Sequence, residues 1–124
     1  MKLSAADAPW QWQVVRVDFE PVKGSEQAGA RPALVISREA SNVVLPVLVV
    51  LPITSQKPGR VVHIGEASLP AGCGGLPNDS IAMCQQIRTI SKQRVRGSYG
   101  YITDEKTCEA VRQSLRVHLD LEST

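Results

Sequence analysis

"VVRVDFEPVKGSEQAGARPALVIS", Val14–Ser37, joins two strand-like segments through a polar, glycine-flanked loop. In its first part, Val14–Phe19, apolar residues alternate with Arg16 and Asp18, which is the period of a half-buried strand. The run Ala33–Ser37 is rich in branched apolar residues and predicts a strand that is covered on both faces. The stretch therefore predicts two neighbouring strands whose connection is far more polar than either of them.

Three polar residues of this loop, Glu26, Gln27 and Arg31, have no evident use in a simple reversal of the chain. Pro32 directly follows Arg31 and holds it in an extended conformation, so the guanidinium sits on a stiff backbone at the mouth of a strand. A guanidinium offers a planar fork of donors that matches two phosphate oxygens at once. Arg31 is therefore a candidate phosphate contact, and a surface ion pair is the alternative.

Further along the chain, four more segments have the composition of short strands: Leu45–Pro52, Val61–Ile64, Ile81–Ile87 and Ser98–Ile102. Loops rich in Gly and Pro separate them. Five or six short strands joined in this way favour a small barrel or a strongly bent sheet.

The last segment, Thr103–Leu121, changes to a helical period. Acidic residues stand in its first turn, where the helix dipole favours them, and Thr103 or Asp104 is expected to cap it. We also expect one extra helical turn in Ser91–Val95. The apolar stripe of the terminal helix consists of Cys108, Val111, Leu115, His118 and Leu119.

The length of 124 residues suits one domain over 1–124, with a core at about 14–121. Hydrophobic residues make up 43% and charged residues 21%, as in ordinary globular proteins. The apolar run Val43–Ile53 is too short to span a bilayer, and the first ten residues lack the apolar stretch of a secretory signal. We therefore expect a cytoplasmic protein. Three cysteines without a CxxC pair, and two histidines, suggest neither a disulfide framework nor a zinc site.

Charge is distributed unevenly, although the net charge is only +2. No acidic residue lies between Asp79 and Asp104, and this interval is locally basic. A solvated face is one interpretation, and a phosphate-binding surface is the other. The basic residues of the interval are Arg88, Lys92, Arg94 and Arg96.

Two further motifs carry polar side chains at the ends of expected strands. "PITSQ" ends the most buried strand with Thr54, Ser55 and Gln56, which present hydroxyl and amide groups from a well-supported scaffold. A simple Ser/Thr turn is the alternative. In "QQIRTI", Gln86 and Arg88 are expected to face outward on the same side of one strand.

Taken in order, the segments quoted above and "GLPNDSIAMCQQIRTISKQRV" resemble the MazF/PemK family of toxin endoribonucleases from about Val14 to Leu121. The resemblance implies a mainly β, small SH3-like barrel with a C-terminal amphipathic helix. It also implies a homodimer and sequence-specific, metal-independent cleavage of single-stranded mRNA, with no cofactor. An acidic antitoxin that folds across the basic groove is the implied partner.

Matching positions assign the roles. Arg31 and Thr54 would be the catalytic pair, and Glu26 lies in the loop beside them with Gln27. The other residues expected near the RNA are Ser55, Gln56, Gln86 and Arg88.

One segment departs from the family pattern. "WQWQ" places Trp12 and Gln13 where the family has Gly and Asp, at the entry to the first strand. Trp10 and Trp12, with Tyr99 and Tyr101, are interpreted as core or interface residues or as platforms for unstacked bases.

Cleavage without a metal requires removal of the 2′-hydroxyl proton, stabilisation of the phosphorane charge and protonation of the 5′-oxygen. His63 is expected in a strand without other site residues and His118 on the apolar stripe, so we interpret both as structural. Arg31 then supplies the charge stabilisation, Thr54 holds a phosphate oxygen or orients the 2′-hydroxyl, and Glu26 is the nearby carboxylate that could accept a proton.

Two other functions are compatible with this fold. The first is a CcdB-like gyrase poison, which acts through an aromatic anchor at the end of the terminal helix, whereas this chain ends in LDLEST. The second is a module that binds RNA or an antitoxin without cleaving anything.

Overall fold

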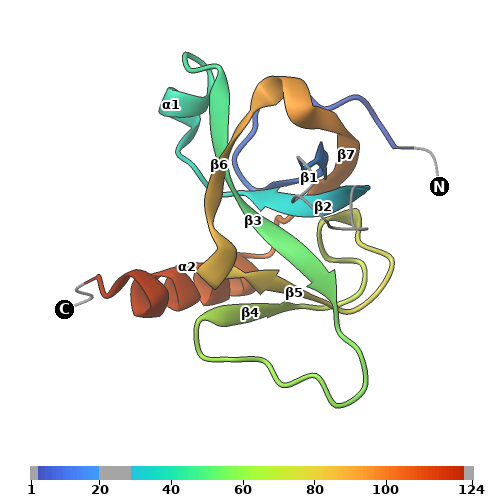
Figure 1. Ribbon diagram of the computed structural model, residues 1–124, viewed down its shortest axis with the longest axis vertical. Helices are drawn as coiled ribbons and strands as arrows, with labels where there is room; N and C mark the ends of the chain where they lie inside the picture. Colours follow the sequence, from blue (N-terminus) through green and yellow to red (C-terminus); the bar gives the residue numbers. More distant parts are fainter. Residues whose placement is uncertain (1–2, 20–28, 122–124) are drawn as a thin grey trace, which may run out of the picture.

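The computed structural model describes residues 3–19 and 29–121 (Figure 1). Seven strands, two α-helices and three short 3-10 turns follow one another in this part of the chain. Their bounds are β1 Gln13–Asp18, β2 Ala30–Val35, α1 Glu39–Asn42, β3 Val47–Ser55, β4 Glu66–Leu69, η1 Cys73–Gly75, β5 Ser80–Met83, η2 Cys84–Gln86, β6 Arg88–Ser91, η3 Lys92–Arg94, β7 Val95–Tyr101 and α2 Glu105–Leu119.

All strand pairs are antiparallel, and β3 is the strand on which the sheet turns. The order is β4-β5-β3-β2-β1-β7, and β6 pairs with the first half of β3 while β5 pairs with its last three residues. Figure 1 shows the resulting strong bend, with β3 running diagonally from one group of strands to the other. The sheet is barrel-like without closing, which confirms the expected bent, mainly β architecture with a C-terminal helix.

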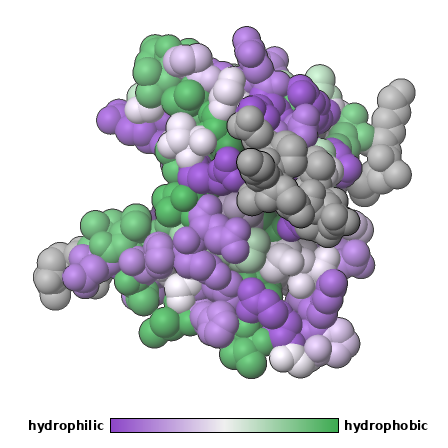
Figure 2. All heavy atoms as spheres, in the orientation of Figure 1, coloured by the Kyte–Doolittle hydropathy of each residue, from purple (hydrophilic) through white to green (hydrophobic). Residues whose placement is uncertain are grey.

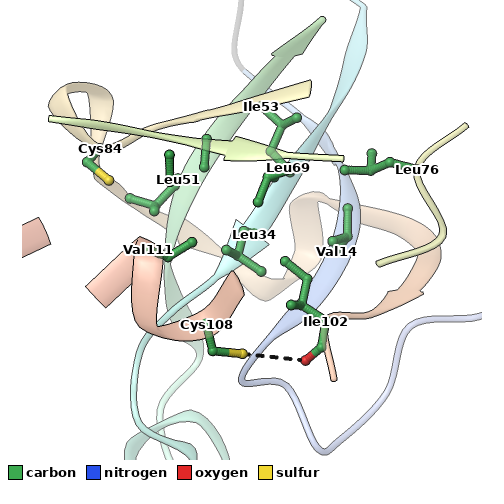
Figure 3. Packing of buried hydrophobic residues seen from close by; sticks show 12 residues of the cluster. Val14, Leu34, Leu51, Ile53, Leu69, Leu76, Cys84, Ile102, Cys108 and Val111 are labelled. Carbon is green, nitrogen blue, oxygen red and sulfur yellow. Dashed lines mark hydrogen bonds between the residues drawn. The ribbon is translucent and has the colours of Figure 1, made fainter. Parts of the chain in front are cut away.

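Two cores lie on opposite faces of the central strands. Neighbouring residues such as Val14 and Val15, or Val50 and Leu51, belong to different cores. The first core packs between the sheet and α2, where Leu34, Leu69 and Val111 meet (Figure 3). The second core, on the other face, contains residues of β1, β2, β3 and β6: Val15, Val17, Phe19, Ala33, Val35, Leu48, Val50 and Ile90. Both faces of β2 and β3 are therefore covered, as their apolar runs predicted.

The terminal helix forms as expected, with a polar cap and one correction. Asp104 is the N-cap, and its Oδ2 accepts hydrogen bonds from the amide of Thr107 at 3.2 Å and from its hydroxyl at 2.7 Å. Cys108 and Val111 are buried, whereas His118 is exposed. Leu119 is exposed too, so the predicted apolar stripe was wrong for the last turn of α2, which extends past the strands in Figure 1.

Two strand predictions were also wrong. Residues 61–64 form no strand; they belong to an irregular loop in which Val61, His63 and Ile64 are exposed, and the strand begins only at Glu66. The segment expected as one strand over 81–87 ends at Met83, where η2 bends the chain before β6 begins at Arg88. The short helix α1 was not predicted, whereas the extra turn in 91–95 was confirmed as η3.

Within the described ranges, 3–19 and 29–121, neither helix has both the length and the apolar character needed to cross a bilayer.

Candidate active site

Arg31 is the second residue of β2 and lies directly opposite Val17 of β1. Val17 is fully buried in the second core, whereas Arg31 is exposed. Since residues opposite one another in an antiparallel pair share a face, Arg31 emerges at the end of the sheet on the face of the second core. Pro32 continues the strand behind it, so the backbone carrying the guanidinium is fixed by the sheet, as the sequence predicted.

Thr54 is the penultimate residue of β3, half-buried and paired with Ile81. The ladder between β2 and β3 ends at Ala33 and Pro52. Arg31 lies two residues before Ala33 on β2, and Thr54 lies two residues after Pro52 on β3, so the two occupy equivalent positions beyond the end of the ladder. Alternation gives both residues the face of Ala33, which belongs to the second core. Alternation along β2 and β3 therefore assigns Arg31 and Thr54 to the same face, two residues beyond the last pair of the β2–β3 ladder.

Arg88 joins this end of the molecule from the other edge of β3. It is the first residue of β6, opposite Val50. Its guanidinium carbon lies 4.8 Å from the ring centroid of Phe19, a cation–π contact at the rim of the second core. Two arginines from different strands thus add positive charge to the same region of the surface, as a polyanion requires.

The remaining residues of the two motifs separate. Ser55 is exposed, and alternation places it on the face opposite Thr54. The side chain of Gln56 holds the following loop, because its Nε2 donates to the carbonyl oxygens of Arg60 at 2.8 Å and Lys57 at 3.3 Å. Gln86 does not share a strand with Arg88, contrary to the prediction. It is exposed in η2, with its Nε2 3.8 Å from the sulfur of Met83.

The loop residues Glu26 and Gln27 lie outside the described residues, and their predicted roles stay predictions. The part of the loop that is described, from Gly29, leads directly into β2 and Arg31. Elsewhere in 3–19 and 29–121, no group of three or more His, Cys, Asp or Glu residues is arranged to hold a metal ion.

Comparison with known proteins decides the family. The family model described as PemK-like, MazF-like toxin of type II toxin–antitoxin system matches residues 10–119. Endoribonuclease EndoA of Bacillus subtilis (strain 168) is 37% identical over 106 residues, which cover 84% of this chain and 88% of the relative. The chain belongs to the PemK/MazF toxin family.

Solved structures agree with this assignment. MazF from Deinococcus radiodurans superposes with a TM-score of 0.71 at 28% identity, covering 93% of this chain and 99% of that one. An endoribonuclease in complex with its cognate antitoxin, from a mycobacterial species, has the same fold, with a TM-score of 0.75 at 21% identity over 94% of this chain and 100% of that one. The findings favour an endoribonuclease toxin over a CcdB-like gyrase poison.

In this PemK/MazF toxin, a buried carboxylate that the sequence analysis missed organises the loop after Thr54. Both oxygens of Glu66 bind the guanidinium of Arg60, at 3.0 and 2.8 Å. The amide of His63 donates to Oε1 at 3.0 Å, and Nε2 of Gln85 donates to Oε2 at 2.6 Å. These donors, Arg60 above all, lower the pKa of Glu66 from 4.5 to about 2. The loop 57–65 is therefore tied back to β4 and η2.

No local pattern in the sequence marks this carboxylate. Arg60, His63 and Glu66 are close in sequence, but Gln85 comes from a segment 19 residues away. Six residues put Arg60 and Glu66 about 20 Å apart in a strand and on different faces of a helix, so only the folded loop shows that they pair.

The four aromatic residues make contacts within the chain, and their use as platforms for bases stays a prediction. Trp12 packs against the first core. The guanidinium carbon of Arg112 lies 5.1 Å from the centroid of the Trp12 ring. The hydroxyl of Tyr99 accepts a hydrogen bond from Arg16 at 3.2 Å, and that of Tyr101 donates to the carbonyl of Pro9 at 2.7 Å. Trp10 packs against the second core.

Both histidines are exposed and lie outside the strands. His63 lies in the loop 57–65 and not in a strand, and its side chain is exposed. His118 is exposed at the end of α2. It lies near Gly65, since a Cβ added to that glycine would be 3.5 Å from the Cβ of His118. The prediction that they form no catalytic pair with Arg31 and Thr54 stays a prediction.

Proposed function

We propose that this PemK/MazF endoribonuclease cleaves single-stranded mRNA between Arg31 and Thr54 by attack of the RNA's own 2′-hydroxyl. The observation that carries the proposal is the shared face of these two residues at the ends of β2 and β3. That face is open to solvent at Arg31 and rests on a fully buried core at Val17 and Ala33. An exposed cation held on a rigid, buried core is the arrangement that preorganised charge stabilisation needs.

The chemistry divides among few groups. The 2′-oxygen attacks phosphorus as its proton leaves, the bond from phosphorus to the 5′-oxygen breaks, and that oxygen takes up a proton. The products are a 2′,3′-cyclic phosphate and a 5′-hydroxyl. Arg31 binds the non-bridging oxygens, on which charge grows in the transition state. Thr54 holds a phosphate oxygen or orients the 2′-hydroxyl.

Proton transfer needs a group other than the arginine, because a permanently charged guanidinium is poorly matched to that task. Glu26 is the proposed proton acceptor, from the loop that leads into β2. Gln27 of the same loop, with Ser55 and Arg88, is proposed to contact RNA. Gln86 is also retained as an RNA contact, while Gln56 acts by fixing the shape of the loop 57–65.

Single-stranded RNA is the proposed substrate class, because paired A-form RNA hides its base edges in a deep, narrow groove. Cleavage of mRNA would take place in the cytoplasm. An acidic antitoxin segment is the proposed partner, since it would compete with RNA for the charges of Arg31 and Arg88.

A homodimer is also proposed, through apolar residues that the single chain leaves exposed. Val61 and Ile64 of the loop 57–65 are exposed, as are Val117 and Leu121 at the end of α2. The two segments are neighbours, because a Cβ added at Gly65 would lie 3.5 Å from the Cβ of His118. Figure 2 shows hydrophobic residues on the surface around the C-terminal end of α2. Covering such a patch favours association of two chains.

The test is cleavage of a mixed single-stranded RNA by the purified protein in EDTA. Arg31→Ala is expected to lower the rate roughly 100- to 1,000-fold, as loss of one preorganised donor does. Thr54→Val, which keeps the shape and removes the hydroxyl, is expected to lower it as well. Lys106→Ala, at an exposed position on α2, is the control and should cleave normally.

Full activity in Arg31→Ala would contradict the assignment. Intact RNA together with inhibition of gyrase would instead support the poison, and RNA binding without cleavage would support a non-catalytic module.

A further inference from the structure

A segment outside the family match is built into the fold. The match begins at residue 10, yet Leu3 and Ser4 already pack on β7. The amide of Ser4 donates to the carbonyl of Ser98 at 3.2 Å, and the amide of Ser98 donates back at 2.8 Å. Gly97 has φ +153°, and a Cβ there would lie 3.0 Å from that of Leu3 and 3.2 Å from the carbonyl oxygen of Ser4. The N-terminal segment therefore has a specific seat on β7.

This segment forms one wall of a cavity of about 430 Å³, which is lined by uncharged residues and two cations. Trp10 lines it from the N-terminal side, and Lys92 and Arg96 line it from η3 and β7. Lys92 Nζ lies 5.5 Å from the centroid of the Trp10 ring. The volume is within the range of about 300–1,000 Å³ that small-ligand sites occupy, enough for a nucleotide.

A bulge in β7 aims Arg96 at this cavity. Arg16 pairs with Gly97 and Val17 with Val95, so Arg96 is the extra residue between them. Its guanidinium donates to the carbonyl of Gln93 at 2.8 Å and meets Asp18 at 3.3 Å.

Two carboxylates, Asp18 and Glu39, stand near these cations. The Asp18–Arg96 pair is about half exposed, with side-chain exposures of 41% and 53%, so it is a weak pair. Glu39 accepts the amides of Trp10 and Gln11 at 2.8 and 2.9 Å. Neither carboxylate lines the cavity, whereas Lys92 and Arg96 do.

The cavity lies close to the proposed cleavage site. Val17 of β1 is flanked by Arg31 on β2 and by Val95 on β7. Two strand spacings separate these neighbours, about 10 Å. A strand of RNA that passes Arg31 can therefore reach Lys92 and Arg96 with its next phosphates.

We propose that the cavity between Trp10, Lys92 and Arg96 binds two successive phosphate groups of single-stranded RNA outside the cleaved bond, one at Lys92 and one at Arg96. The proposal rests on the endoribonuclease function argued above and adds a second anchoring point for the substrate. RNA is favoured over an acidic peptide because its phosphates repeat along a chain already held at Arg31, and because Trp10 offers a ring beside the cations on which a base can rest. The N-terminal segment then increases the length of RNA that the toxin binds.

The test measures binding of two 2′-O-methyl RNAs, which lack the nucleophile and cannot be cleaved. One is short and covers the cleaved site alone, and the other extends beyond it in both directions. Loss of two phosphate contacts in Lys92→Gln/Arg96→Gln is expected to weaken binding of the long RNA about 25-fold at 0.1 M salt and to make its log–log salt slope shallower by about 1.4. Lys92→Gln alone keeps the Asp18–Arg96 pair and removes one phosphate contact, so it should make the slope shallower by about 0.7.

Binding of the short RNA should not change in either variant, and Lys106→Gln should behave as wild type with both RNAs. An unchanged slope for the long RNA overturns the proposal, as does an equal loss for both RNAs. Reduced binding of an acidic peptide with unchanged binding of RNA also overturns it and identifies a peptide site. If wild-type protein neither binds nor cleaves unmodified RNA, the proposed function itself fails; normal cleavage with an unchanged slope removes only the second anchoring point.

Discussion

Replacing Glu66 with Gln tests whether the buried carboxylate holds the loop after Thr54. The variant keeps the shape of the side chain and removes the charge that Arg60 faces at 2.8 Å. The fall of the Glu66 pKa from 4.5 to about 2 corresponds to about 3 kcal/mol at 1.36 kcal/mol per pKa unit. In a protein of this size, a loss of about 3 kcal/mol lowers the melting temperature by about 10 °C.

The pH dependence has a definite sign. Folding lowers the pKa of Glu66, so its stabilisation is fully present above pH 4.5 and is lost as the pH falls toward 2. The difference in melting temperature between wild type and Glu66→Gln, measured by thermal unfolding, should be large at pH 7 and shrink to less than half at pH 3. Glu105→Gln is the matched control, because that exposed carboxylate pairs with Arg112 on the surface of α2.

Two results would refute this reasoning. One is a difference between wild type and Glu66→Gln at pH 7 no larger than that of the control. The other is a difference that stays constant from pH 7 to pH 3, since it would show that the charge of Glu66 contributes nothing to stability.

Two further substitutions test the fold that supports the site. Gly75→Ala should cost about 3 kcal/mol or more in chemical denaturation, because φ is +79° and the new Cβ would lie 2.1 Å from the carbonyl oxygen of Tyr99; Gly59→Ala, with φ +80° and open space around it, should cost only about 1 kcal/mol, and equal costs would disprove the clash. Asp104→Ala should lose about 1 kcal/mol of stability with its N-cap, and an unchanged unfolding midpoint would argue against that role.

The central strands and α2 could be predicted because their signals are local. The apolar runs of β2 and β3 and the helical stripe with its acidic first turn follow from period and composition alone. The local sequence made Arg31 and Thr54 candidates, through a following proline and the end of a buried strand, and the family resemblance made them a pair. The structure adds what no local pattern contains, namely the register that gives both residues one face.

The failures have non-local causes. The run Val61–Ile64 has the composition of a strand, but the bond between Arg60 and Glu66 closes the loop across it and leaves it exposed. Strand β5 ends at Met83, and the turn that follows places the side chain of Gln85 on the carboxylate of Glu66. The four residues of α1 are too few for a periodic signal. The helix is held in place by Glu39, whose carboxylate accepts hydrogen bonds from the amides of Trp10 and Gln11.

The central claim, that Arg31 and Thr54 promote cleavage of RNA by its own 2′-hydroxyl, is tested most directly by the chemistry of the cut ends. Mass spectrometry of fragments produced by the wild-type protein in EDTA should find a 2′,3′-cyclic phosphate on the upstream fragment and a 5′-hydroxyl on the downstream one. A 3′-hydroxyl with a 5′-phosphate would show that water or another external nucleophile attacks, and would contradict the account.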